Sequence, residues 1–554
     1  MEEIAFDLLR EPWIRVMKPD GSVVECSLMQ TLLDSHHYLR LAGELPTQDV
    51  AILRLLLAVL HTVFYRVDTD GEEAPLKECE DALDRWKSLW DAGHLPEQPI
   101  RDYLMKYEDR FWLFHPENPF YQVPGAAGGT YYSAAKLNGT LSESANKLRL
   151  FAARTGENKA NLSYAEAARW LLYLNGFDDT SAKPKGKELP SPGAGWLGKL
   201  GLIYAEGNTL FETLLLNLVL LDDEGEPWGN PRPAWELEIP RSAERTEVIM
   251  PDNQAELLTL QSRRILLERK AEKVSGCTLL GGDFFQKINA TAEQMTIWNR
   301  KDGKKNEAPY DLPKRLEADR QMWRDFSVIT GMGSAGRAPG VVRWIALLKK
   351  ERTLDRDRLI RLRVVGVKYG DKDFFVEDIL ADHLDFYASL LEEAGKIWAE
   401  LIQEKISQTE HAARALRTLA EELYLAEGGS PAAGARKARA DEAAQEYYAS
   451  VDIPFRTWLR SIDPAQGDDQ DLREDKDIQW RETAYRLAVN QGKCMIRNAG
   501  ERAFVGRWIT NQQKGGKNAN QQTHHSSAEA FDQFKKELWT CFQLKHQERG
   551  VADA

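Results

Sequence analysis

The feature that most constrains the fold is a helical pattern that fills the chain after about residue 380. Apolar residues recur there at helical spacing, and Gly428–Pro431 marks one break between helices. The expected helices are 387–406, 413–423, 438–461, 476–500 and 527–541. Long helices joined by short breaks are typical of an antiparallel bundle, so we expect a C-terminal four-helix bundle.

The first 370 or so residues carry mixed signals. Two short strands are expected around the Pro-Asp-Gly turn of Ile14–Val24, and helices are expected over 164–174 and 47–64, the latter with Thr47 as its N-cap. Long proline- and glycine-rich connections are expected at 116–129, 183–201 and 225–240. We therefore expect an α+β protein, with a mixed domain with long loops over 1–375 and the bundle over 380–548.

Composition is that of an ordinary globular protein. The 554 residues are 43% hydrophobic and 29% charged, and the apolar stretch Val50–Phe64 is interrupted by Arg54 and His61. We expect no membrane span, and since Met1-Glu-Glu-Ile lacks the basic start of a signal peptide, we expect a cytoplasmic protein. The five cysteines form no CxxC pair, so neither a disulfide framework nor a metal site is expected.

The formal net charge of −13 argues against a protein that coats nucleic acid nonspecifically. A nucleic-acid function would require local basic patches against this acidic background. Candidate patches are 263–270, 300–305 and 436–439. Each patch is equally well explained as a solvated face.

A glycine-rich segment, Gly193–Gly201, is the strongest local candidate for a binding loop. Four glycines fall within nine residues, with Trp196 among them, and glycine lets a backbone approach a ligand closely. Tryptophan and lysine beside such a loop suit a nucleic-acid backbone. Lys199 is followed by leucine, so the segment is no Walker phosphate loop, and a plain surface loop is the alternative.

Several blocks resemble, in order, the large subunit (CasA family) of the type I-E CRISPR complex Cascade. The most specific block is Phe111–Gln122, which resembles an aromatic-x-Leu-x-His-x-x-x-Pro-Phe-x-Gln signature. The opening Phe6–Ile14, the apolar helix 50–64, the glycine segment and the C-terminal helices complete a match over nearly the whole chain.

The resemblance implies a noncatalytic subunit with a mixed N-terminal domain and a four-helix bundle. Such a subunit senses the protospacer-adjacent motif (PAM) on duplex DNA and helps to open the duplex. Guide RNA then reads the sequence by base pairing. The implied partners are guide RNA, the other Cascade subunits, target DNA and a helicase-nuclease that is recruited afterwards, with no cofactor and no membrane.

The resemblance also implies DNA-contacting residues. The glycine loop that approaches the PAM corresponds to Gly193, Ala194, Gly195 and Trp196. On this basis, Gly195→Asp is expected to weaken PAM-dependent binding and to leave the fold intact. A basic residue placed in the minor groove corresponds to Arg300 or Lys301, although an exposed turn at Asp302-Gly303 is the alternative.

Two further elements follow from the same resemblance. The wedge that splits the first base pair corresponds to Asp371, Lys372 and Asp373, for which a simple hairpin turn is the alternative. The loop that holds the guide RNA corresponds to Arg149, Phe151 and Arg154, for which the alternative is that Phe151 belongs to the core.

Other function classes have less support. The sequence holds neither an HExxH nor a GxSxG motif, and we expect no catalytic residues. Some CasA proteins carry paired CxxC segments, whereas the matching regions here retain only Cys277, so the resemblance implies no zinc. The remaining alternative is a helical protein–protein scaffold without direct DNA contact.

Overall fold

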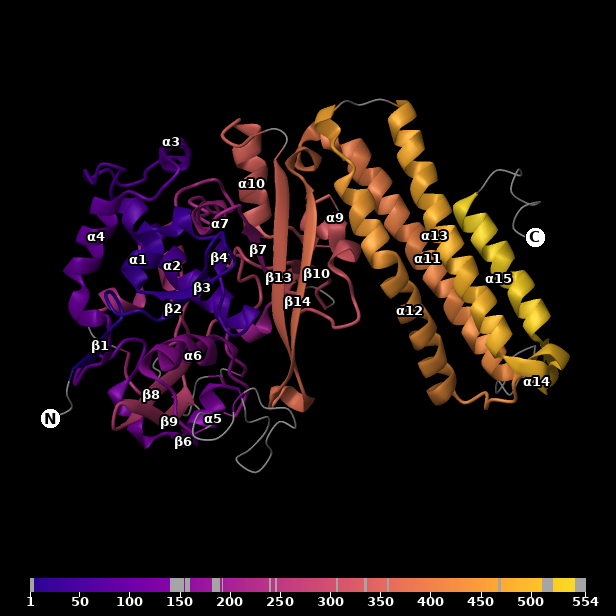
Figure 1. Ribbon diagram of the computed structural model, residues 1–554, viewed down its shortest axis with the longest axis horizontal. Helices are drawn as coiled ribbons and strands as arrows, with labels where there is room; N and C mark the ends of the chain where they lie inside the picture. Colours follow the sequence, from indigo (N-terminus) through magenta and orange to yellow (C-terminus); the bar gives the residue numbers. More distant parts are fainter. Residues whose placement is uncertain are drawn as a thin grey trace. The chain divides into compact units, whose positions relative to one another are not determined.

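The chain folds into two compact units. The computed structural model describes residues 4–139, 154, 160–181, 190–191, 193–238, 241–244, 247–304, 307–332, 336–355, 358–466, 470–510 and 522–543. Unit 1 comprises Met1–Met322, Val328–Asp355 and Ile360–Leu384, and unit 2 comprises Trp323–Ser327, Arg356–Leu359 and Asp385–Ala554. Strands mixed with helices, followed by a C-terminal helical region, confirm the predicted α+β class (Figure 1).

Unit 1 is built from small sheets with helices packed around them. Its strands are β1 (Ala5–Asp7), β2 (Ile14–Met17), β3 (Val23–Cys26), β4 (Arg40–Leu41), β5 (Trp112–Phe114), β6 (Thr130–Ser133), β7 (Leu202–Glu206), β8 (Arg263–Lys270), β9 (Lys273–Gly281), β10 (Trp298–Lys301), β11 (Tyr310–Pro313), β12 (Gly336–Arg337), β13 (Leu359–Tyr369) and β14 (Val376–Tyr387). The three-stranded sheets have the orders β3-β2-β4, β6-β9-β8, β11-β10-β12 and β14-β13-β7.

The helices of this part of the chain are mostly short. They are α1 (Leu28–Leu33), α2 (Pro46–Arg66), α3 (Cys79–Ala92), α4 (Glu97–Lys106), α5 (Ala134–Leu137), α6 (Tyr164–Phe177), α7 (Leu210–Leu216), α8 (Gln254–Leu258), α9 (Phe326–Ile329) and α10 (Gly340–Lys350). The predicted strands around the Pro-Asp-Gly turn are confirmed as β2 and β3, which pair from Ile14 opposite Cys26 to Met17 opposite Val23.

The long apolar helix α2 is the centre of unit 1 and packs against α6 and α8. Among the described residues it is the one helix apolar and long enough to cross a membrane, but nearly all of it is buried inside the unit. Burial lowers the pKa of His61 to about 3, so this histidine is a neutral core residue. The predicted N-cap was wrong: Thr47 lies inside the helix, which begins at Pro46 because proline's fixed φ suits the first helical position.

The pairing between β7 and β13 determines which residues lie beside the turn of the long β13–β14 hairpin (Figure 1). The two strands are antiparallel, with Leu202 opposite Val365 and Glu206 opposite Arg361. Residues that precede Leu202 in the chain therefore lie alongside residues that follow Val365. This register places the glycine segment beside the turn of the hairpin.

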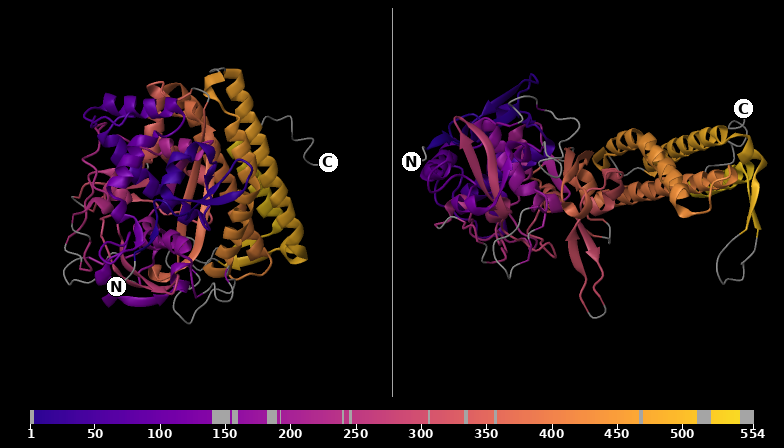
Figure 2. Two further views of the ribbon diagram at one scale, coloured as in Figure 1. Left: turned by 60° about the vertical axis from the view of Figure 1, so that its left-hand side comes forward. Right: turned by 90° about the horizontal axis from the view of Figure 1, so that it is seen from below.

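Unit 2 contains the predicted bundle. Its helices are α11 (Lys396–Ala426), α12 (Ala433–Arg460), α13 (Gln470–Asn498), α14 (Gly500–Val505) and α15 (Ser527–Phe542), and β15 (Arg507–Thr510) pairs with β16 (Gln522–His525). The four long helices lie side by side (Figures 1 and 2). Phe455 packs against Trp458 and Trp480 at ring-centre distances of 5.4 and 4.9 Å, so this aromatic block belongs to the bundle core.

Two helices predicted separately are one. The helix α11 runs without a break through the expected gap at 407–412, because Thr409 and Ala412 continue the buried stripe. Tyr387, expected to begin the first helix, instead ends strand β14. Apolar spacing continued across both junctions, so periodicity alone could not locate the true ends.

Candidate nucleic-acid interface

The glycine loop, Gly193–Leu200, has a backbone that requires its glycines. Gly193 has φ +65°, and among the described residues no atom beyond its chain neighbours lies within 4 Å of the point where a Cβ would lie. A Cβ at Gly195, by contrast, would lie 2.3 Å from the carbonyl oxygen of Gly176. The expectation that Gly195→Asp leaves the fold intact is therefore wrong, because a backbone atom blocks the added side chain.

The side chain of Trp196 is buried and holds the loop in place, so its ring is not exposed to a ligand. Its indole is 3% exposed and donates a hydrogen bond of 2.8 Å to Glu293. Glu293 also accepts two hydrogen bonds from the buried Arg54 of α2, at 2.9 and 3.0 Å. The side chains of Trp196 and Ala194 are both buried, so a contact of these two residues with DNA stays a prediction that would involve their backbone. What the loop can offer a ligand is its backbone near Gly193.

A second buried charge cluster holds the outer part of the loop. The guanidinium of Arg263 donates to the carboxylate of Asp178 at 2.5 Å and to the carbonyl oxygen of Gly193 at 2.8 Å. Lys136 pairs with the same Asp178 at 2.9 Å. Arg264 is buried too and pairs with Asp283 at 2.7 Å. The start of the 263–270 patch is therefore structural, not a basic surface.

The turn of the β13–β14 hairpin carries the predicted wedge, Asp371, Lys372 and Asp373. Lys372 and Asp373 have φ values of 54° and 60°, a left-handed conformation that non-glycine residues adopt at a cost of about 1 kcal/mol each. Asp373 is not available as a wedge residue, because both of its carboxylate oxygens accept hydrogen bonds of 2.9 Å from Arg315. Its backbone oxygen also accepts a hydrogen bond from Thr180.

Three residues at this turn are exposed: Asp371, Lys372 and Phe374. Lys372 extends into solvent, and Phe374 is 49% exposed. The neighbouring Phe375 packs inward, since a Cβ on Gly370 would lie 2.2 Å from its ring. Phe374 was missed at the sequence level, where the adjacent pair of phenylalanines gave no indication of which ring would face solvent.

The glycine loop and the hairpin turn touch. A Cβ on Gly198 would lie 1.9 Å from the hydroxyl oxygen of Tyr369, the last residue of β13. That hydroxyl donates to the carbonyl oxygen of Phe177 at 2.7 Å. The guanidinium of Arg315 stacks over the Tyr369 ring at 5.4 Å. Loop, turn and Arg315 therefore form one surface, which we call the loop–turn surface.

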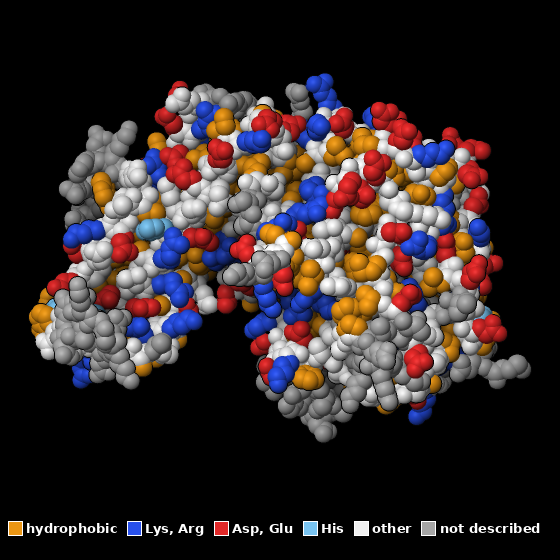
Figure 3. All heavy atoms as spheres, turned by 180° about the vertical axis from the view of Figure 1, so that it is seen from behind, with side chains coloured by type: hydrophobic (Ala, Val, Ile, Leu, Met, Phe, Trp, Pro, Cys, Tyr) orange, Lys and Arg blue, Asp and Glu red, His pale blue; other side chains and the backbone are white. Residues whose placement is uncertain are grey.

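Several cationic side chains lie near Lys199 in the glycine loop. Burial, with the nearby positive charges of Arg263, Lys287 and Arg315, lowers the pKa of Lys199 to about 7, and only Asp373 opposes this effect. Over the face shown in Figure 3, Lys and Arg side chains lie among Asp and Glu, and some are gathered near its middle. A local positive field of this kind suits phosphate groups, although the chain is acidic overall.

The other predicted contact residues are placed as follows. Arg300 and Lys301 end strand β10 and are exposed, with Arg300 paired to Asp311 at 3.2 Å. No hydrogen bond or ion pair joins either residue to the glycine loop within the described part of the chain. Arg154 is engaged by two carboxylates, Glu44 at 2.8 Å and Glu166 at 2.9 Å, so it would have to exchange them to meet a phosphate. Arg149 and Phe151 lie outside the described residues.

Basic residues of unit 2 are also paired. Arg436 lies 3.6 Å from Glu421, Arg439 lies 3.3 Å from Glu427, and Arg417 pairs with Asp441. Exposed pairs of this kind contribute little to stability, but they lower the net positive charge that the bundle presents. No group of three or more His, Cys, Asp or Glu residues suited to a metal ion occurs among the residues described.

Comparison with known proteins identifies the family. The model of the family described as CRISPR-associated protein Cse1 matches residues 7–491. This chain belongs to that family. The predicted resemblance to the CasA large subunit is thereby confirmed. A curated relative, the CRISPR-associated protein CasA/Cse1 of Thermus thermophilus, is 33% identical over 332 residues, which are 58% of this chain and 60% of the relative. That alignment spans less than two thirds of the relative's length.

Solved Cse1 structures match over almost the full length. The crystal structure of Thermobifida fusca Cse1 has a TM-score of 0.78 and 28% identity, covering 98% of this chain and 99% of that chain. Cse1 from Acidimicrobium ferrooxidans has a TM-score of 0.77 and 26% identity with the same coverage. A chain of a CRISPR RNA-guided surveillance complex shares the fold, with a TM-score of 0.69 at 17% identity over 97% of this chain and 100% of that chain.

Proposed function

We propose that this Cse1-family chain is the noncatalytic subunit through which a type I-E Cascade complex senses the PAM on double-stranded DNA. In this proposal it helps to open the duplex for guide-RNA pairing and then presents the complex, in the cytoplasm, to a helicase-nuclease. Family membership and the fold shared with a chain of an RNA-guided surveillance complex support the assignment to such a complex. The DNA-sensing role depends on the loop–turn surface.

The observation that carries this proposal is the contact between a nearly side-chain-free backbone and an exposed hairpin turn. Gly193 can approach base edges in a minor groove, where a larger residue would collide. The turn beside it exposes one cation, Lys372, and one aromatic ring, Phe374. An apolar side chain inserted at a base step unstacks it at a cost of a few kcal/mol, which contacts to the phosphates offset.

The ion pair between Arg315 and Asp373 has a positioning role in this proposal. Together with the hydrogen bonds from Thr180, it holds the turn in a left-handed conformation against the body of unit 1. A turn fixed before DNA arrives loses less conformational entropy on binding than a mobile one. The wedge is therefore proposed to consist of Lys372 and Phe374, and Asp373 holds the turn in place through its ion pair with Arg315.

The alternative is a protein scaffold without DNA contact, and the paired arginines of unit 2 favour that alternative for unit 2. A salt titration distinguishes it from the present proposal. A complex assembled with and without this chain is titrated with PAM-containing duplex at increasing salt. Each phosphate that the chain neutralises is expected to steepen the slope of log K against log[salt] by about 0.9. An identical slope with and without the chain would favour the scaffold.

Removing the exposed cation and the exposed aromatic ring of the turn is expected to slow duplex opening. For Lys372→Ala combined with Phe374→Ala, we expect the opening rate to fall by about tenfold or more, because the few kcal/mol of unstacking are no longer offset. Opening is followed with a fluorescent base analogue next to the PAM.

The control for this variant is Lys87→Ala, an exposed residue of α3 that pairs with Asp91 and belongs to neither the turn nor the glycine loop. It should open DNA at the wild-type rate. Binding to a target already unpaired next to the PAM should be equal for all three proteins. An unchanged opening rate in the double variant would remove the turn from the mechanism.

Lys199 predicts a pH dependence of DNA binding. Because its pKa is lowered to about 7, a nearby phosphate would favour the protonated form, and binding would take up a proton. Affinity is therefore expected to rise as the pH falls from roughly 8 to roughly 6, by up to about tenfold. Lys199→Met should flatten this part of the profile. A profile that is identical in both proteins would exclude Lys199 from the interface.

A further inference from the structure

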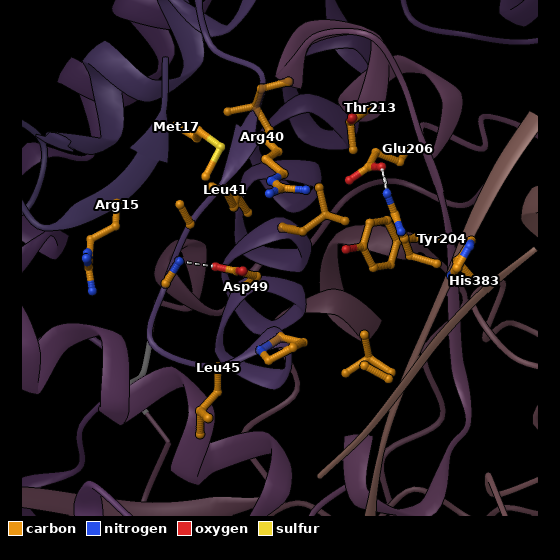
Figure 4. A pocket seen from close by; sticks show the side chains of 18 of the residues that line it. Arg15, Met17, Arg40, Leu41, Leu45, Asp49, Tyr204, Glu206, Thr213 and His383 are labelled. Atoms are coloured by element: carbon orange, nitrogen blue, oxygen red, sulfur yellow. Dashed lines mark hydrogen bonds and ion pairs between the residues drawn. The ribbon is translucent and has the colours of Figure 1, made fainter. Parts of the chain in front are cut away.

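A pocket of about 560 Å³ opens on unit 1, separate from the glycine loop (Figure 4). Its wall is formed by strands β2, β4, β7, β13 and β14 and by the start of helix α2. The volume lies within the range of small-molecule sites, about 300–1,000 Å³. The pocket therefore has room for a ligand of its own.

Two guanidiniums give the pocket an uncompensated positive charge. Arg15 from β2 and Arg40 from β4 line it, and neither side chain has an ion pair or hydrogen bond within the part of the chain that the structure describes. Both lie close enough to Asp49 to influence its charge. Figure 4 shows the Asp49 carboxyl between the two arginines, with Arg15 on one side of it and Arg40 on the other.

Of the four carboxylates that line the pocket, Glu44 and Glu206 are paired with guanidiniums, and Asp382 accepts a hydrogen bond of 2.8 Å from the backbone N–H of Met322. Glu206 pairs with Arg363, with an Nε–Oε2 distance of 2.8 Å. Glu44 pairs with Arg154 and Arg169, at 2.8 and 3.4 Å. A neutral or anionic ligand group that contacts Arg15 or Arg40 is therefore repelled less by Glu44 and Glu206 than it would be by unpaired carboxylates.

Asp49 is held in place and is less acidic than usual. Its Oδ1 accepts a hydrogen bond of 2.7 Å from the backbone N–H of Gly43. Burial raises the pKa of the carboxyl to about 7, so near neutral pH it is partly protonated and can donate a hydrogen bond. The hydroxyl of Tyr204 points toward Asp49 across the pocket, and burial also raises the pKa of this tyrosine, which therefore remains a donor (Figure 4).

The wall also contains a set of apolar side chains, beside the polar Thr213, Arg363, Asp382 and His383. The apolar side chains are Met17, Leu41, Leu45, Leu53, Leu210 and Val364. Guanidiniums, apolar side chains and hydrogen-bonding groups in one pocket suit the parts of a nucleotide: phosphate, base and sugar hydroxyls.

We propose that this pocket binds one phosphate-bearing nucleotide, with its phosphate on Arg40, within the positive field to which Arg15 adds, and its base against the apolar side chains of the wall. Tyr204 and Asp49 provide hydrogen bonds to the sugar or to the edge of the base. A free mononucleotide and the phosphorylated end of a nucleic-acid strand offer the same chemistry. The proposal does not depend on PAM sensing, because the loop–turn surface takes no part in it.

The test measures binding of adenosine monophosphate to the full-length chain by calorimetry, with adenosine and inorganic phosphate as partial probes. Saturable one-to-one binding is expected, with each partial probe at least about tenfold weaker, because each lacks one half of the contacts. Arg15→Gln with Arg40→Gln should reduce the affinity by about tenfold or more. The single variant Arg40→Gln, at an exposed position, should show part of that loss with an unchanged melting temperature.

The matched control is Arg232→Gln, an exposed arginine that pairs with Asp252 and does not line the pocket. It should bind like the wild type. A 5′-phosphorylated single-stranded oligonucleotide distinguishes the two sources: competition with the mononucleotide indicates a strand end, and independent binding indicates a free nucleotide. Absence of saturation by the mononucleotide, or equal affinity in the double arginine variant, would overturn the proposal.

Discussion

Replacing Glu293 by alanine is expected to destabilise unit 1 by about 3–5 kcal/mol, because it leaves the buried charge of Arg54 without its partner. Glu293 is 1% exposed and accepts hydrogen bonds from Arg54 and from the Trp196 indole. The substitution would remove the acceptor of the Trp196 indole, which holds the glycine loop, and also the ion-pair partner of Arg54 in α2. We therefore expect loss of DNA binding along with loss of stability.

Hydrogen exchange of α2 in the native protein is the suitable measurement, since a chain of two units need not unfold in a single transition. Glu293→Gln, which keeps an acceptor for the indole, should be less destabilising than alanine. The exposed Glu224→Ala should change stability by less than about 0.5 kcal/mol. Equal exchange protection in Glu293→Ala and the wild type would show that the buried pair does not support this region.

Replacing Gly193 by aspartate is expected to weaken binding of PAM-containing duplex by about tenfold or more, since a carboxylate would face the DNA phosphates. The left-handed φ of +65° penalises any side chain at this position, and the space around it is open. Aspartate and asparagine tolerate this conformation to similar degrees. Comparison of the two variants therefore isolates the effect of charge from that of shape.

Gly193→Asn is accordingly the matched control and should retain most of the affinity. Dissociation constants for duplexes with and without a PAM, measured on the assembled complex, give both affinity and discrimination. Equal affinities of the aspartate and asparagine variants would mean that no phosphate lies near Gly193. The family assignment would stand, but the glycine loop would no longer belong to the interface.

The parts of the fold that were predicted correctly are those set by local sequence. Apolar spacing over tens of residues indicated the bundle helices, and the Pro-Asp-Gly turn indicated the β2–β3 hairpin. Helix ends were less predictable: Tyr387 continues the apolar spacing of α11 but ends a strand. Tertiary contacts, not periodicity, decide such boundaries.

The candidate interface was predictable only in part, because its residues are distant in the chain. The resemblance identified the glycine loop and the hairpin turn, but their contact arises from the register of β7 against β13. Trp196 and Arg263 carry chemistry that suits nucleic acid, yet both are buried by partners distant in the sequence, Glu293 and Asp178. Sequence composition cannot show whether a charge has a buried partner.

The central claim, that the loop–turn surface senses the flank of a DNA target, is tested most directly by selection from a randomised flank. Guide-RNA complexes with and without this chain are incubated with duplexes that share the guide-matched stretch and carry random neighbouring bases, and the bound fraction is sequenced. We predict that selection of particular flanks requires this chain and is lost in the Gly193→Asp variant. Binding that ignores the flank, or is unchanged when the chain is omitted, would contradict the proposed function.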